Sequence, residues 1–190
     1  MQDHMVLQSA PQRAIVWGYG DLNAFTTLKM NGRVYHTMSG SSPVNSIGES
    51  IWSVTLDAES EEGPFEILVT QPLANGTLGS IELKDVLFGD VWVCSGQSNM
   101  QFAVIDLGPF NASQEIANAI NYPKIRLFTA ALVPSDNPIE ELLGIAQNWA
   151  VASPQSVGGP SYNYFSATCW LYGRMIHEAL GRRPLGLIAT

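Results

Sequence analysis

The sequence predicts an α/β protein in which a lobe of antiparallel strands precedes part of a parallel sheet flanked by helices. Two observations lead to this prediction. From Met5 to about Leu87, short β-type runs alternate with turn residues, and after Gly89, strand-like apolar runs alternate with helical patterns. We therefore expect two domains, a β-sandwich-like lobe over residues 1–87 and an α/β domain over residues 88–190.

The β lobe is predicted from four runs rich in β-branched and aromatic residues. Gly and Pro residues separate these runs at short and regular intervals, a spacing that is typical of a small antiparallel sandwich. The predicted strands cover residues 14–18, 25–28, 52–56 and 65–69.

The second domain is predicted from strands and helices that alternate along the chain. The continuous apolar run 91–94 is typical of a strand that is buried on both faces. Helices are expected over 111–121, with Asn111 or Ser113 as the N-cap, and over 166–180, ended by Gly181. Further strands are expected at 124–128 and 185–189. Because such a parallel sheet normally has more strands, the domain is expected to be incomplete.

The region 132–160 is rich in Pro, Ser, Asn and Gly, and it is expected to form a long surface loop with at most one helical turn. Trp149 lies in this loop and is therefore a candidate for contact with a substrate. Most other tryptophans are expected in the core, among them Trp92 in the predicted buried strand and Trp170 on the apolar face of a helix.

Composition excludes several classes of protein. Hydrophobic residues make up 46% of the 190 residues and charged residues 14%, which is far from the composition of a disordered chain. The net charge is −8 and no window is strongly basic, so nucleic acid is not an expected partner. No apolar run reaches the roughly 20 residues that would span a membrane.

Two segments fit the acceptor pattern for N-glycosylation, at Asn75 and at Asn111. This modification acts on chains that enter the secretory pathway, yet the first residues lack the features of a signal peptide. A leader that is absent from this sequence is therefore expected. The two cysteines, Cys94 and Cys169, either form a disulfide or lie apart as small buried residues, and we favour the second alternative because neither belongs to a metal-binding motif.

The segment 89–100, GDVWVCSGQSNM, carries the clearest chemical signal. An apolar strand runs into a turn that contains Gly96 and Ser98, and a serine in this position is held at the sheet edge where open α/β folds bind ligands. Backbone N–H groups at such a turn can stabilise a developing oxyanion. The alternative is that Ser98 only caps the next segment, as many turn serines do.

The same segment resembles the nucleophile block of the sialate O-acetylesterases, which are serine esterases of the SGNH type. The resemblance extends over essentially the whole chain, because weaker matches occur in family order at residues 4–8, HMVLQ, at 84–90, KDVLFGD, and at 165–170, FSATCW. It implies that the second domain is the first part of a three-layer α/β/α fold.

The resemblance also implies a mechanism. Ser98 would attack an acetyl ester to form an acyl-enzyme, and the Ser98 backbone N–H would form part of the oxyanion hole. Gln97 and Asn99 would fix the turn. The implied substrate is O-acetylated sialic acid, no cofactor or metal is implied, and the implied location is lysosomal or extracellular.

The sequence departs from the family pattern in one respect. The general base of this hydrolase type is a His three positions after an Asp, and no Asp-x-x-His occurs here. His4, His36 and His177 are therefore expected to be surface or packing residues. Without a base, the chain is alternatively an inactive fragment or one chain of a two-chain enzyme, completed by a C-terminal partner. A third hypothesis is that the β lobe is a carbohydrate-binding module.

Overall fold

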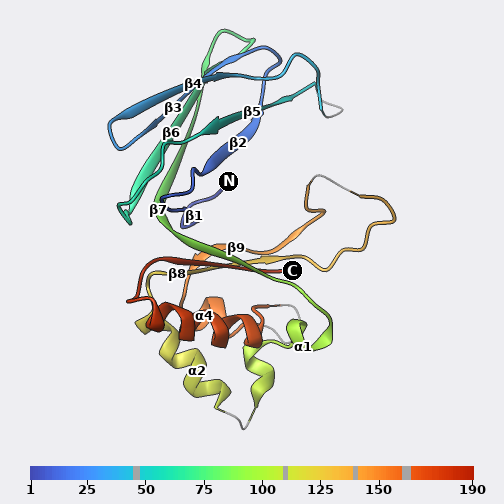
Figure 1. Ribbon diagram of the computed structural model, residues 1–190. Helices are drawn as coiled ribbons and strands as arrows, with labels where there is room; N and C mark the ends of the chain where they lie inside the picture. Colours follow the sequence, from blue (N-terminus) through green and yellow to red (C-terminus); the bar gives the residue numbers. More distant parts are fainter. Residues whose placement is uncertain (45–47, 109–110, 139–140, 160–163) are drawn as a thin grey trace. The chain divides into compact units, whose positions relative to one another are not determined.

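The computed structural model describes residues 1–190 apart from 45–47, 109–110, 139–140 and 160–163. The described residues form two compact units (Figure 1). The β lobe comprises residues 1–3 and 8–88, and the α/β unit comprises residues 4–7 and 89–190. One long strand, β7 (Leu78–Cys94), contributes to both units, and the predicted α/β fold class is confirmed.

The β lobe contains two antiparallel sheets. In one sheet β2 (Ile15–Gly20) pairs with β5 (Ser50–Thr55). In the other, β3 (Phe25–Met30) lies between β4 (Arg33–Met38) and β6 (Phe65–Pro72), and β6 pairs in turn with residues 78–86 of β7. In β3, β5 and β6 every second side chain is buried, including Leu28, Val54 and Ile67, so the period of two places one face of these strands in the core.

The α/β unit is built on a sheet with the strand order β7-β10-β8-β9. Strand β10 (Leu185–Ala189) runs parallel to the last residues of β7 and to β8 (Ile125–Ala130). In the register, Ala189 lies beside both Cys94 and Thr129, so that the carboxyl ends of the three parallel strands meet at one edge. Strand β1 (Val6–Gln8) also pairs with β7.

The prediction of a long surface loop over 132–160 is wrong. It contains β9 (Ile145–Val151), which pairs antiparallel with β8, and a short helix, α3 (Pro154–Val157). The strand was missed because Gln147 and Asn148 interrupt its apolar pattern. Gln147 is nevertheless buried, and its side-chain amide donates a hydrogen bond of 3.0 Å to the carbonyl oxygen of Ser156.

The helices of the α/β unit pack against one side of its sheet (Figure 1). Two of them were predicted, α4 (Ala167–Ala179) and α2 (Ala112–Asn118), which continues as a 3₁₀ turn, η2 (Ala119–Asn121). Helix α4 has Ser166 as its N-cap and ends before Gly181, whose φ is 72°. The remaining pieces are α1 (Ser98–Gln101) and the 3₁₀ turn η1 (Val104–Leu107). Buried side chains of α4 and the strands, among them Trp170 and Leu187, form the core.

The sequence predicted that the end of β7 is buried on both faces, and this prediction is wrong. Trp92 is 40% exposed and Val93 is 65% exposed, and only Cys94 in this run is fully buried. The burial of a strand's two faces depends on the elements that pack over them, and an apolar run in the sequence does not determine these elements. Trp92 packs edge-on against Tyr172 of α4 at a centroid distance of 5.4 Å, so it is not a core residue.

Candidate active site

Ser98 lies just beyond the carboxyl end of a parallel strand, as predicted. β7 ends at Cys94, the next three residues form an exposed turn, and the single helical turn α1 begins at Ser98. The Ser98 side chain is exposed, and no residue in the described part of the chain forms a hydrogen bond with its hydroxyl. Its role as a nucleophile stays a prediction, and it lies at the edge where open α/β sheets bind ligands.

The backbone of α1 leaves two N–H groups, those of Ser98 and Asn99, without an acceptor in the helix. Met100 and Gln101 donate to the carbonyl oxygen of Gln97, at 2.7 and 3.2 Å, and Phe102 donates to that of Ser98 at 3.0 Å. The amides of Ser98 and Asn99 precede these donors, and the first N–H groups of a helix have no acceptor within the helix. They are therefore available to an oxyanion. Gln97 fixes the turn through its carbonyl oxygen, which accepts two of these hydrogen bonds. Its side chain makes no capping hydrogen bond.

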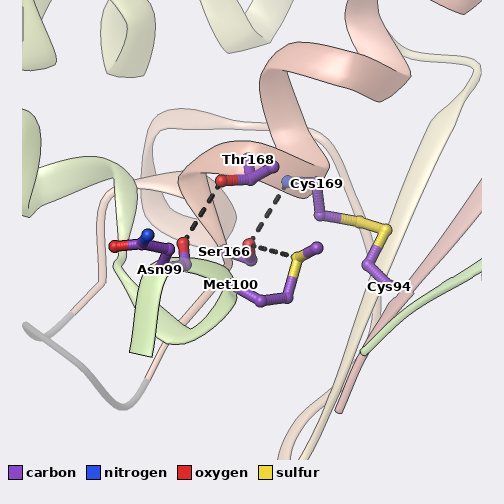
Figure 2. Close-up of a disulfide and its surroundings, with 6 residues drawn as sticks. All are labelled: Cys94, Asn99, Met100, Ser166, Thr168 and Cys169. Atoms are coloured by element: carbon purple, nitrogen blue, oxygen red, sulfur yellow. Dashed lines mark hydrogen bonds between the residues drawn. A yellow bond between two sulfur atoms is a disulfide. The ribbon is translucent and has the colours of Figure 1, made fainter. Parts of the chain in front are cut away.

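The first turn of α4 contacts this segment (Figure 2). The Thr168 hydroxyl donates a hydrogen bond of 3.2 Å to the carbonyl oxygen of Asn99. The Ser166 hydroxyl lies 3.4 Å from the sulfur of Met100 and also accepts a hydrogen bond from the Cys169 N–H. The turn that carries Ser98 is therefore attached to a helix that the sequence places about 70 residues away. Thr168 was not among the predicted site residues, because no local pattern relates it to Ser98.

A disulfide joins Cys94 at the end of β7 to Cys169 in α4 (Figure 2). The preference for two separate buried thiols was therefore wrong. The two Cα atoms are 5.8 Å apart although 75 positions separate the residues in the sequence. Sequence spacing could not reveal this pairing, since it depends on the packing of α4 against the end of the strand.

A hollow of about 210 Å³ lies beside α1 at the carboxyl ends of β8 and β10. This is the edge at which open α/β sheets bind ligands. Ser98 itself does not line the hollow, although Gly96 and Met100 of the same turn do. Apolar atoms dominate its surface, and the lining is formed by Gly96, Met100, Gln101, Thr129, Ala130, Ala131, Leu132, Val133, Ala146, Tyr164, Ser166, Ala189 and Thr190.

Neither histidine of the α/β unit contacts Ser98. His177 is buried, and its Nδ1 hydrogen-bonds the carbonyl oxygen of Arg183 at 2.8 Å. It lies nine residues along α4 from Thr168, which is about 14 Å of helix. Burial lowers the pKa of His177, and a nearby Arg182 lowers it further. His4 contacts Arg126 at 3.4 Å, three residues before Thr129 and so about 10 Å along β8 from the ligand-binding edge.

His36 belongs to the β lobe. Its ring stacks on Phe25 at a centroid distance of 5.1 Å and its Nδ1 lies 3.3 Å from the Thr27 hydroxyl. All three histidines thus occupy packing or surface positions, in agreement with the expectation from the sequence.

Trp149, predicted as a substrate contact in a polar loop, lies instead in β9. Its ring packs against Phe128 at a centroid distance of 5.7 Å, and it does not line the hollow beside α1. The acceptor residues Asn75 and Asn111 are both exposed. Asn111 precedes α2 with a φ of 70° and makes no side-chain cap. Asn75 accepts hydrogen bonds from the N–H and the hydroxyl of Thr77, at 2.9 and 2.7 Å.

Among the residues that the structure describes, no group of three or more His, Cys, Asp or Glu side chains is arranged to hold a metal ion. No helix that the structure describes is long and apolar enough to cross a membrane.

Comparison with known proteins supports the resemblance seen in the sequence. The whole chain is 35% identical to the sialate O-acetylesterase of Rattus norvegicus, 36% to that of Mus musculus and 34% to that of Homo sapiens. The chain spans about a third of the length of these relatives, between 34% and 35%. No protein-family model matches the chain.

A solved structure of a carbohydrate acetylesterase from Xanthomonas citri is also similar. It superposes with a TM-score of 0.80 and 26% sequence identity, over 99% of this chain and 38% of that one. The similarity to esterases therefore extends from the sequence to the three-dimensional arrangement of the chain.

Proposed function

We infer, from the resemblance of the whole chain to the sialate O-acetylesterases, that it is part of a serine esterase that removes acetyl groups from carbohydrates. The observation that carries the proposal is the position of Ser98. Ser98 is exposed at the carboxyl edge of the parallel strands and is the first residue of α1. It lies inside the segment that resembles the family's nucleophile block.

The proposed reaction has two stages. Ser98 Oγ attacks the acetyl carbonyl carbon while a base removes the hydroxyl proton, and the amide of Ser98 stabilises the oxyanion. The ester C–O bond then breaks, and the proton passes to the departing sugar oxygen. In the second stage water attacks the acetyl-enzyme and releases acetate, and the proton from water restores the serine hydroxyl.

We propose that the base lies outside these 190 residues. No Asp-x-x-His occurs in the sequence, and neither His4 nor His177 lies beside Ser98 in the α/β unit. The resemblance to the sialate O-acetylesterases also implies a Gly and an Asn as further oxyanion donors, and we propose that they too lie outside these residues. The chain spans about a third of its relatives' length, which leaves room in a longer protein for these groups.

The proposed substrate is an O-acetylated sialic acid. It is inferred from the relatives' name, whereas the Xanthomonas citri structure supports only the broader class of acetylated carbohydrates. The test is acetate release from O-acetylated sialic acid and from an O-acetylated neutral sugar, by the protein at its natural length. We expect faster release from the sialic acid. Equal or faster release from the neutral sugar would overturn this substrate and leave the esterase proposal standing.

The same assay tests the catalytic serine. Ser98→Ala should reduce release from both substrates by at least about a thousandfold, since loss of a nucleophile removes the covalent route. Ser80→Ala is the matched control, because Ser80 is an exposed serine of the β lobe. The isolated 190-residue chain should show no Ser98-dependent release. Release by this chain that disappears in Ser98→Ala would show that the base lies within it.

A second candidate function is favoured by the exposed end of β7. Trp92 and Val93 are large apolar side chains at 40% and 65% exposure, and such a strand end favours association with a partner. The chain would then act as the partner of a C-terminal chain that completes the catalytic domain. Analytical ultracentrifugation of the isolated chain tests this, because a stable monomer over a wide concentration range would count against it.

The proposed location is the secretory pathway, with a lysosomal or extracellular destination. It is supported by the exposure of Asn75 and Asn111, which leaves both acceptor sites accessible. Secretion from a eukaryotic cell, followed by N-glycosidase treatment and mass measurement, tests it. Two modified sites that disappear in Asn75→Gln and Asn111→Gln are expected, and an unmodified chain retained in the cytosol would contradict the proposal.

A further inference from the structure

The short helix α1 that begins with Ser98 has little support of its own. It contains four residues, Ser98–Gln101, and none of them is fully buried. A single helical turn is unfavourable in isolation, because nucleation fixes several residues for one hydrogen bond. The position of the Ser98 hydroxyl must therefore depend on contacts made from outside the turn.

Those contacts come from the first turn of α4 (Figure 2). Three of the residues that anchor this turn are nearly inaccessible: Cys94 is 8% exposed, Cys169 1% and Ser166 2%. The disulfide attaches α4 to the end of β7, and Ser166 caps α4 while its hydroxyl lies against Met100. In addition, the Ala167 N–H donates a hydrogen bond of 2.7 Å to Phe102. The first turn of α4 thus contacts the chain both before α1, at Cys94, and after it, at Phe102.

Among these residues of α4, Thr168 contacts the chain position nearest to Ser98. Its hydroxyl donates to the carbonyl oxygen of Asn99, the residue that follows Ser98. The last carbonyl groups of a helix lack donor partners within it, so this bond satisfies a group that a four-residue helix leaves open. It also fixes the peptide plane between Asn99 and Met100.

We propose that Thr168 is a positioning residue for the reaction of Ser98, which holds the nucleophile turn through the Asn99 carbonyl group. This inference rests on the proposed esterase function. Thr168 does not touch the reacting atoms, and its side chain is exposed, so that its hydroxyl contributes to the site without being part of the core. Its loss should affect the turn and leave the fold in place.

We expect the loss of the Thr168 hydroxyl to affect kcat and to leave KM nearly unchanged. Small misplacements of a reacting group cost large factors in rate, on the order of a hundredfold for 1 Å. Removal of the Thr168 hydroxyl should therefore lower kcat by about tenfold, and KM should stay within about twofold because no contact with substrate is lost.

The experiment compares three variants of the protein at its natural length. Thr168→Val removes the hydroxyl and keeps the shape of the side chain, whereas Thr168→Ser keeps the hydroxyl. Thr55→Val is the matched control, since Thr55 is an exposed threonine on β5 of the β lobe. Two assays are made on each variant. One gives kcat and KM on an acetyl ester, and the other gives amide hydrogen exchange at residues 100–102, whose N–H groups donate to Gln97 and Ser98.

In Thr168→Val we expect exchange at these amides to accelerate about three- to tenfold, the effect of one lost hydrogen bond, together with the fall in kcat. Thr168→Ser should restore both quantities, and Thr55→Val should change neither. Unchanged exchange and unchanged kcat in Thr168→Val would overturn the proposal, as would a change that Thr168→Ser fails to reverse. If the unmodified protein hydrolyses no ester, the esterase proposal fails, and hydrogen exchange still decides whether Thr168 holds the turn.

Discussion

Cys94, the last residue of β7, is bonded to Cys169 in the first turn of α4, with the two Cα atoms 5.8 Å apart. The bond closes a loop of 75 positions that contains the turn with Ser98, α2 and β8. It therefore joins the strand that presents Ser98 to the helix that supports the following residues.

Removal of the disulfide should destabilise the α/β unit. A cross-link over a loop of this length lowers the entropy of the unfolded chain by an amount equivalent to about 4 kcal/mol. We expect the Cys94→Ala, Cys169→Ala double variant to lose a free energy of unfolding of up to about that size, measured by urea denaturation. A dithiol reductant should destabilise the unmodified protein similarly and leave the double variant unchanged. Equal stability of the oxidised and reduced protein would contradict a bonded pair.

Trp170 should be among the most costly positions to truncate. Its side chain is fully buried, its ring lies edge-on to Tyr122 at 5.7 Å, and its Nε1–H donates a hydrogen bond of 3.2 Å to Glu115. Trp170→Ala should lower the free energy of unfolding by about 3–5 kcal/mol. The control is Trp17→Ala, because Trp17 is 41% exposed and its loss should cost about 1 kcal/mol or less. Similar losses in both variants would show that Trp170 is not a core residue.

The buried side chain of His177 should make the free energy of unfolding depend on pH. Burial, the largest cause, lowers the pKa of His177 below its ordinary value of 6.5, and nearby Arg182 and Lys124 act in the same direction. The hydrogen bond to Arg183 and the charge of Glu178 oppose the shift. Below pH 6.5 the unfolded chain therefore binds a proton more readily than the folded one. The stability due to this group is complete above about pH 6.5 and is lost as the pH falls through the lowered pKa.

The measurement is the free energy of unfolding at about pH 7.5 and at about pH 5.5. We expect it to fall at the lower pH, and to fall less in His177→Asn, which cannot titrate but can still donate to the Arg183 carbonyl group. Comparison of the two proteins removes the contribution of other titrating residues. If both lose the same stability on acidification, His177 is not buried in its neutral form.

The elements with strong local signals were predicted from the sequence. The strand at 185–189 was predicted with its observed bounds, and the helix at 166–180 agrees closely with α4, because Ser166 caps it and Gly181 ends it. The predicted strands of the β lobe agree with β2, β3, β5 and β6. The position of Ser98 at the end of a strand followed from the same kind of local pattern.

The missed features depend on contacts between distant residues. No local signal pairs Cys94 with Cys169 or brings Thr168 to Asn99, and the exposure of Trp92 depends on which elements pack over the end of β7. Strand β4 was also missed, although a signal for it exists. Asn31 and Gly32 have φ values of 48° and 71°, and an Asn-Gly pair between two β-type runs is typical of a tight hairpin.

The most direct test of the proposed role of Ser98 is to trap the acetyl-enzyme. The protein at its natural length is mixed with an acetyl ester, quenched in acid within the first turnovers, and digested for peptide mass mapping. We expect one acetyl group on the peptide that carries Ser98, and none on that peptide in Ser98→Ala, which should also release no acetate. Release of acetate at an undiminished rate by Ser98→Ala would contradict the assignment of Ser98 as the nucleophile.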